Sequence, residues 1–249
     1  MQNIFLMERF FNTAGPQIIK DNYTINPLSR FDLDEILMLI RQKRYFVLHA
    51  PRQTGKTSCM LALRDYLNER DDYICVYVNV ENAQAARGNI RSAIHTICDL
   101  FAESMKNFHQ IGLSLKIRDE LRNADENSML GLFLQRISEA YPVPIVLIID
   151  EIDALVGDSL VSVLRQIRSG YANRPQSFPQ SIILCGVRDV RDYRIVLSNQ
   201  DIVTGGSAFN IKAKSLRLGN FSKEEIHELF MQHTCETGQE FDAGCFPLV

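Results

Sequence analysis

The sequence lacks the features that mark secreted, membrane-spanning and metal-stapled proteins. Its six cysteines form no C-x-x-C pair and no group with histidines at metal-ligand spacing, so we expect no structural zinc site. The longest apolar run, Val143 to Ile149, is far shorter than the roughly 20 residues that a membrane-spanning helix requires. Met1 to Phe11 has no basic region, long apolar core or cleavage site, which argues against a signal peptide. We therefore expect a cytoplasmic protein with no membrane partner, whose cysteines are mostly small buried hydrophobes.

The sequence also lacks an excess of positive charge, internal repeats and low-complexity tracts. The formal net charge of −3 gives no overall attraction to a polyanion, which makes free-standing nucleic-acid binding an unfavoured alternative. What the chain does have is 46% hydrophobic and 23% charged residues over 249 positions, a composition typical of a globular protein with a sizeable core. We expect one main domain.

Short apolar runs alternate with amphipathic segments along the chain. Four runs predict strands that are covered on both faces, at Tyr45 to His49, Ile74 to Val80, Ile145 to Ile149 and Ser181 to Val187. A fifth strand is predicted over Ser215 to Leu218. Apolar residues recur at helical spacing over Thr57 to Asn68 and again from Leu160 to Ile167. This alternation predicts an α/β fold with a mostly parallel sheet and helices on both faces.

Two further segments predict helices outside this alternation. Asn89 to Tyr141 is long and mostly helical, with a break expected at Asn123 to Asn127, and it inserts extra helices between the second and third strands. Near the end of the chain, Ser222 to Glu225 is a capping-box sequence that opens a helix. We therefore predict a main domain over residues 1–220 and the start of a helical lid over residues 221–249, which we expect to be truncated.

The first strand and its helix are joined by a segment that matches a phosphate-binding loop, G-x-x-x-x-G-K-[ST], in which backbone N–H groups converge on phosphate oxygens. The predicted nucleotide-binding residues are Ala50, Pro51, Arg52, Gln53, Thr54, Gly55, Lys56, Thr57 and Ser58. Lys56 is placed to reach the β- and γ-phosphates, and the Thr57 hydroxyl to ligate Mg2+. The alternative is a chance G-K-T at the start of a helix, which the strand before it and the amphipathic helix after it make improbable.

One position departs from the loop pattern, because Ala50 replaces its first glycine. Alanine costs on the order of 1 kcal/mol if the position needs positive φ, and little in extended backbone. Pro51 directly after Ala50 biases that residue toward extended backbone, so we expect the replacement to be tolerated.

A second motif is the apolar run Ile145 to Ile149 followed by Asp150 and Glu151. It places two carboxylates at the carboxyl edge of a buried strand, where ligand sites of open α/β sheets lie. Asp150 is predicted to hold Mg2+, directly or through a water, opposite Thr57. Glu151 is predicted to be the general base or water-orienting group for attack on the γ-phosphate. The alternative is that Asp150, Glu151 and Asp153 only cap the next helix.

The fourth strand delivers Arg188 to the same edge, where a guanidinium is predicted to contact the γ-phosphate and report its loss. The alternative is a surface arginine that pairs with Asp189 or Asp192. Further arginines precede this strand and are read as a solvated face, with a role as arginine fingers toward a neighbouring subunit as the alternative: Arg165, Arg168 and Arg174.

The segment from Tyr23 to Phe31 lies upstream of the first strand. One reading is that Tyr23 or Phe31 stacks on an adenine base. The other reading, a loop that seals the edge of the core, is equally open at this point. The five histidines form no triad with a nucleophile and receive no chemical role.

The chain as a whole resembles the AAA-like domain of uncharacterised bacterial P-loop ATPases, close to the AAA+ proteins and the STAND-type signalling ATPases. The segments that carry the resemblance are Phe46 to Thr57, the strand that ends in Asp150-Glu151, and Leu184 to Tyr193. It covers about residues 10 to 240. It implies ATP as ligand, Mg2+ as cofactor, a sheet of order 5-1-4-3-2 and a sensor-like position for Arg188. It also implies a lid that this chain mostly lacks, so binding should survive better than turnover.

The residues and the resemblance together predict a magnesium-dependent ATPase whose nucleotide state drives a conformational switch, with Glu151, Lys56 and Arg188 as the catalytic set. Two alternatives stay open: a slow ATP-binding signalling module with little turnover, and an AAA+ helper that acts on DNA. The preference for ATP over GTP comes from the resemblance, as no guanine-reading N-K-x-D motif is present. An unknown protein partner or effector and a homo-oligomer are compatible with the sequence, which identifies neither.

Overall fold

The computed structural model describes residues 9–110, 112–242 and 244–245. The segment 1–8, part of the stretch in which no signal peptide is expected, and the end of the predicted lid region at 246–249 lie outside the described residues. Within the described part, no helix has both the length and the apolar character needed to cross a bilayer.

The centre of the molecule is a parallel five-stranded sheet in the order β2-β3-β4-β1-β7. Its strands are β1 Tyr45–His49, β2 Ile74–Asn79, β3 Ile145–Asp150, β4 Ser181–Gly186 and β7 Lys212–Arg217. Counted along the five sheet strands, this is the order 5-1-4-3-2 that the resemblance implied, and that prediction is confirmed. A separate antiparallel pair, β5 Arg194–Val196 and β6 Ile202–Thr204, follows β4.

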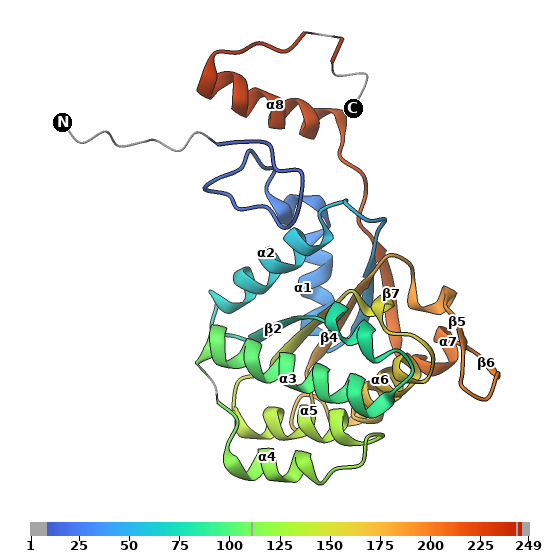
Figure 1. The fold of residues 1–249 in the computed structure, drawn as a ribbon. Coiled ribbons are helices and arrows are strands. Elements are labelled where there is room, and N and C mark those ends of the chain that lie inside the picture. The colour runs from blue at the N-terminus through green and yellow to red at the C-terminus, as the bar shows by residue number, and fades with distance from the viewer. Residues whose placement is uncertain (1–8, 111, 243, 246–249) are drawn as a thin grey trace.

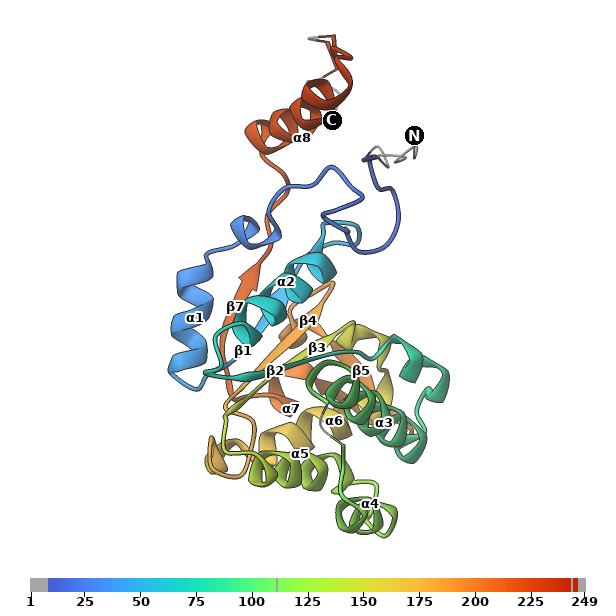
Figure 2. The same cartoon turned by 90° about the vertical axis from the view of Figure 1, so that its left-hand side faces the viewer.

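Helices cover both faces of the sheet (Figures 1 and 2). The eight α-helices among the described residues are α1 Leu33–Arg41, α2 Lys56–Asn68, α3 Ile90–His109, α4 Leu115–Arg122, α5 Met129–Ala140, α6 Gly157–Ser169, α7 Gly205–Ala208 and α8 Lys223–Thr237. Successive strand side chains point to opposite faces, so Phe46 and Leu48 pack under α1 and α2. Tyr45 and Val47 pack on the other face with α3, α5 and α6. Both faces of β1 are therefore buried, as its continuous apolar run predicts.

Two predicted elements need correction. The fifth strand spans Lys212–Arg217 and not Ser215 to Leu218, because it is an edge strand with exposed charged side chains and therefore lacks a continuous apolar run. The long helical segment has the predicted break, between α4 and α5, but also a second break after His109. There Gln110 adopts left-handed backbone with φ 55° and ends α3.

Residues 9–26, called the N-terminal segment below, lie with α8 beyond the carboxyl edge of the sheet, and both views place this segment between α8 and α2 (Figures 1 and 2). α8 starts with the predicted capping box, in which Ser222 and Glu225 bond each other's backbone. Thr24 and Gln232 join the two segments, since the Thr24 N–H donates to Gln232 Oε1 at 3.2 Å and Gln232 Nε2 donates to the Thr24 carbonyl at 2.9 Å. The space between sheet edge, N-terminal segment and α8 is where the site lies.

The core packing predicts a stability contrast between two leucines on helices. Leu63 of α2 is 0% exposed against the sheet, whereas Leu115 of α4 is 78% exposed. Leu63→Ala should lower the free energy of unfolding by about 2–5 kcal/mol, because it removes buried methylene contacts and leaves a cavity. Leu115→Ala should change it by no more than about 0.5 kcal/mol. Urea denaturation of both variants measures the contrast, and equal losses would contradict the packing.

Candidate functional site

The loop that joins β1 to α2 folds back over the N-terminus of α2. Its left-handed residues are Gln53, with φ 62°, and Gly55, with φ 84°. Ala50 is buried and lies outside the left-handed region, which agrees with the expectation drawn from Pro51. The Ala50 N–H donates to the carbonyl of Gly186 at 3.2 Å, so the start of the loop continues the pairing of β1 with β4.

Lys56 closes the loop from inside. Lys56 is only 5% exposed, and its Nζ donates to the carbonyl of Pro51 at 3.1 Å. The Thr54 hydroxyl donates to the same carbonyl at 2.8 Å. An ammonium has three N–H donors, and the bond to the Pro51 carbonyl uses one of them. The other two suit Lys56 to bind an anion in the loop.

Asp150 is the most enclosed carboxylate of the site, with 0% exposure at the end of β3. Its Oδ2 accepts from the Thr57 hydroxyl at 2.9 Å and from the Tyr77 hydroxyl at 2.8 Å. Its Oδ1 accepts from the Glu151 N–H at 2.9 Å. Burial, together with the neighbouring Asp150 charge, raises the pKa of Tyr77, so this hydroxyl stays a proton donor to the carboxylate. These three donors compensate the burial of a charge.

Glu151 sits in left-handed backbone with φ 56°, which is unusual for a residue with a Cβ. Burial raises the pKa of its carboxyl, and the negative charges of Asp150 and Asp153 raise it further. The alternative that Asp150, Glu151 and Asp153 only cap the next helix does not agree with their contacts. Glu151 makes no capping bond at the short helical turn Ile152–Ala154, and Asp153 Oδ1 accepts from the Val187 N–H at 3.1 Å.

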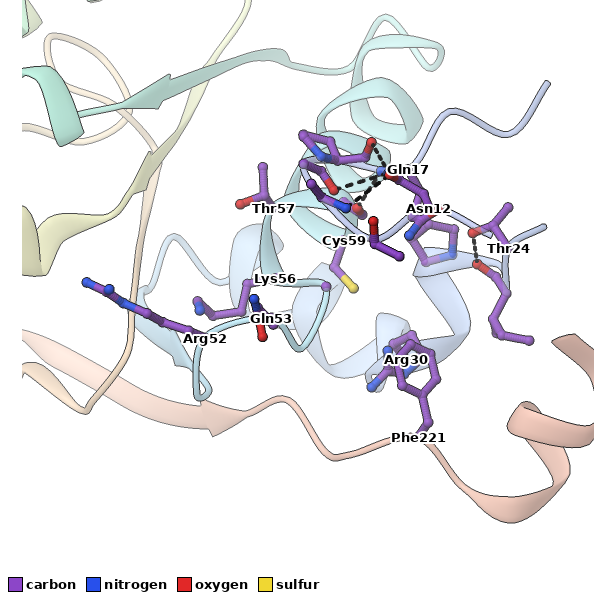
Figure 3. A pocket seen from close by; sticks show the side chains of 18 of the residues that line it. Asn12, Gln17, Thr24, Arg30, Arg52, Gln53, Lys56, Thr57, Cys59 and Phe221 are labelled. Atoms are coloured by element: carbon purple, nitrogen blue, oxygen red, sulfur yellow. Dashed lines mark hydrogen bonds between the residues drawn. The ribbon is translucent and has the colours of Figure 1, made fainter. Parts of the chain in front are cut away.

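A cavity of about 550 Å3 opens beside these groups (Figure 3). Among the predicted site residues it is lined by Arg52, Gln53, Gly55, Lys56, Thr57, Ser58 and Glu151. Its far side is formed by residues from the N-terminal segment, by Phe221 just before α8 and by Leu229 within α8. Cys59 also lines it, but burial raises the pKa of this thiol to about 11, so it remains protonated near neutral pH. The cavity thus joins the loop and Glu151 into one site.

Arg188 is placed differently from the other predicted residues. It follows β4 at the carboxyl edge, but its side chain is exposed and does not line the cavity. The alternative, a pair of Arg188 with Asp189 or Asp192, is not among the ion pairs of the described residues, and Asp189 instead pairs with Lys212 at 2.6 Å and with Arg191 at 3.0 Å. Burial acts to raise the pKa of Asp189, but hydrogen bonds from Lys212 and the Arg191 N–H hold it well below its usual range. Contact of Arg188 with a γ-phosphate stays a prediction.

The two aromatic residues proposed to stack on a base differ in position. Tyr23 lines the cavity, but it is buried, and its ring packs against Phe11 with a centroid distance of 4.9 Å and against His233 at 5.2 Å, as in a segment that seals the core. Phe31 packs against the core on the α1 and α2 side and does not line the cavity. Phe221, 42% exposed, is the phenylalanine that does line it, and the sequence reasoning missed it.

Two other residues of the site were missed. Tyr77 was read only as part of an apolar strand, although a hydroxyl in a buried strand needs a partner and so pointed to one. Arg30 lies in the segment Tyr23 to Phe31, where its guanidinium donates to the carbonyl of Thr54 at 3.4 Å and lines the cavity. A lone arginine after a proline-containing turn carries no sequence signal for such a contact.

Comparisons with known proteins agree with this architecture. The model of a family described as "AAA domain" matches residues 40–193, which include the loop, β3 and the Arg188 region. A comparison with curated proteins gave no match.

Three solved structures are similar in fold. The Walker-type ATPase Paby2304 of Pyrococcus abyssi has a TM-score of 0.56 and 19% identity over 87% of this chain and 61% of its own. Cdc6p from Pyrobaculum aerophilum has a TM-score of 0.57 and 16% identity over 89% and 52%. A DNA replication initiation factor has a TM-score of 0.50 and 11% identity over 92% and 57%. This chain therefore spans only part of each of these proteins, and at such identities the likeness shows the fold alone.

The raised pKa of Glu151 predicts how stability depends on pH. Because the folded-state pKa is higher than the unfolded one, the charged carboxylate opposes folding at neutral pH, and this penalty vanishes below the ordinary pKa of glutamate. Glu151→Gln should therefore raise the melting temperature near pH 8, with a gain that shrinks toward about pH 4. Glu103→Gln, at an exposed glutamate of α3, serves as control. Thermal melts that show Glu151→Gln less stable than the native chain near pH 8 would contradict the argument.

Proposed function

The chain belongs to the AAA domain family, and from this premise we propose that it binds ATP with Mg2+ in the loop Ala50–Thr57 and hydrolyses it slowly to drive a conformational switch. The observation that carries the proposal is that Lys56, Thr57 and Glu151 line one cavity while Thr57 and the buried Asp150 are directly bonded. Cation, hydroxyl and two carboxylates at the end of a buried parallel strand suit phosphoryl chemistry better than any other reaction class.

The triphosphate would lie against the loop and the first turn of α2. Gly55 is in left-handed backbone directly before the helix, so the backbone can approach a phosphate where a Cβ would be strained. The free N–H groups of the first turn point into this region and favour an anion. Lys56 would release the neutral Pro51 carbonyl and bind the β- and γ-phosphates instead. Its hydrogen bonds to these charged oxygens would be stronger than the bond it gives up.

The donor set fits Mg2+. Thr57 and Asp150 offer only oxygen atoms, and among the described residues no group of three or more His, Cys, Asp or Glu side chains is arranged to hold a metal. Both Asp150 oxygens already accept hydrogen bonds, so we propose that Thr57 ligates the ion and Asp150 holds it through a water. When bound, Mg2+ would neutralise charge on the β- and γ-phosphates.

Hydrolysis is assigned to Glu151. Glu151 has left-handed backbone and lines the cavity, where its carboxylate would orient a water for in-line attack. Backbone outliers of this kind cluster at functional sites because the surrounding structure holds them in place. Arg188 remains the proposed γ-phosphate contact at the exposed rim of the same edge.

The domain assignment stays a proposal. Residues 1–220 would form the ATPase unit, and residues 221–249, including α8, would belong to a helical lid over the nucleotide. A closer assignment to bacterial STAND-type ATPases and the identity of an effector rest on the resemblance alone. The alternative of a DNA helper is supported by the name of one structural neighbour, a DNA replication initiation factor, but not by charge, since the net charge is −3.

The proposal predicts that binding and turnover separate between two substitutions. Lys56→Ala should weaken binding of a fluorescent ATP analogue in Mg2+ by roughly tenfold or more, because it removes a charged donor to phosphate. Glu151→Gln should keep binding but slow phosphate release by roughly 10²–10⁴-fold. Lys106→Ala, an exposed lysine of α3, is the matched control.

Each outcome has a clear meaning. Equal nucleotide binding by the native chain and Lys56→Ala would overturn the binding site. Phosphate release that survives in Glu151→Gln would overturn the assigned base. Tight binding with negligible release by the native chain would favour the slow ATP-binding module over an ATPase.

A further inference from the structure

One guanidinium connects three parts of the molecule that are far apart in sequence. Arg30 NH1 donates to the carbonyl of Thr54 in the loop at 3.4 Å, and NH2 donates to the carbonyl of Gly219 after β7 at 2.7 Å. Its Nε lies 3.5 Å from Glu225 Oε1 in the first turn of α8. The guanidinium carbon lies 3.6 Å from the centroid of the Phe221 ring, and Figure 3 shows these two side chains against each other.

This environment requires an arginine. The Arg30 side chain is 4% exposed, so its permanent charge needs compensation inside the protein. A planar guanidinium presents donors in several directions and stacks on an aromatic ring at the same time, whereas the ammonium of a lysine cannot do both. The four contacts therefore depend on each other through one rigid group.

The contact with Thr54 reaches the phosphate side of the loop through one peptide plane. In a trans peptide the C=O and the N–H point in opposite directions. Arg30, which also lines the cavity, holds the Thr54 carbonyl and thereby fixes the direction of the Gly55 N–H, opposite to that carbonyl. Gly55 lines the cavity, so this N–H is among those that a bound phosphate would use.

The contact with Glu225 reaches the start of α8. Glu225 Oε2 accepts from the Ser222 N–H at 2.7 Å and completes the capping box, while Oε1 faces Arg30. One carboxylate thus both initiates the helix and pairs with the buried guanidinium. Movement of the first turn of α8 would break this pair and leave the Arg30 charge without its carboxylate.

We propose that Arg30 is a positioning residue that couples the phosphate loop to α8, so that nucleotide binding holds α8 in place and α8 in turn strengthens nucleotide binding. The inference rests on the proposed function, since it requires a triphosphate in the loop. It assigns no chemistry to Arg30, which acts through the Gly55 N–H and Glu225. Coupling of this kind is reciprocal, so both directions must show the same factor.

The test uses a charge change that leaves the helix cap intact. In Glu225→Gln the residue can still complete a capping box, because glutamine serves at this position as well as glutamate, but the charge opposite Arg30 is lost. Glu224→Gln is the matched control, since Glu224 is exposed in the same turn and has the same charge. Arg30→Lys is a second variant, which keeps the charge and loses the fork of donors.

Hydrogen exchange of the α8 amides is followed with and without a slowly hydrolysed ATP analogue and Mg2+, and bound analogue is measured in the same samples. In the native chain and Glu224→Gln, saturating analogue should slow exchange by about fivefold or more. In Glu225→Gln and Arg30→Lys this slowing should be lost, and the affinity for the analogue should fall by the same factor.

Two other results separate the inference from its premise. Analogue that binds with unchanged α8 exchange in the native chain, or native-sized slowing in Glu225→Gln, would overturn the coupling and leave the proposed function intact. A native chain that binds no analogue would overturn the proposed function itself, and the coupling with it.

Discussion

The site depends on the hydrogen bond between the Thr57 hydroxyl and Asp150 Oδ2, which is 2.9 Å long. Asp150 is fully buried at the end of β3, and a buried carboxylate without donors would cost several kcal/mol. The bond satisfies part of that need and at the same time sets the start of α2 against β3. Tyr77 and the Glu151 N–H provide the remaining donors. Loop, helix and carboxylate therefore occupy fixed relative positions before any ligand binds.

The order of the sheet makes this arrangement possible. β4 lies between β1, which leads into the loop, and β3, which carries Asp150, so the two motifs meet across one intervening strand at the carboxyl edge. Gly186 at the end of β4 allows Asp153 to pack closely against that strand end, because a Cβ there would lie 2.7 Å from Asp153 Oδ1. The loop and Glu151 line one cavity at this edge.

Elements and site residues with a signal in the local sequence were predicted, and those that depend on distant contacts were not. Buried parallel strands are continuous apolar runs, so β1, β3 and β4 were predicted to within a residue, and the loop motif located Lys56 and Thr57. The edge strand β7 and the break after His109 were misjudged because exposed charges and a left-handed Gln110 give weak signals. Tyr77, Arg30 and Phe221 were missed since their roles come from contacts between distant segments, which no spacing in the chain encodes.

The most direct test of the account removes the hydroxyl that joins the loop helix to the buried carboxylate. Thr57→Val keeps the shape of the side chain, and ATP affinity is measured with Mg2+ and with a chelator. The account predicts that the gain in affinity that Mg2+ provides falls by roughly 10–100-fold, a larger loss than the fall in affinity measured in chelator. A Mg2+ gain in Thr57→Val equal to that of the native chain would show that Thr57 and Asp150 do not form the metal site.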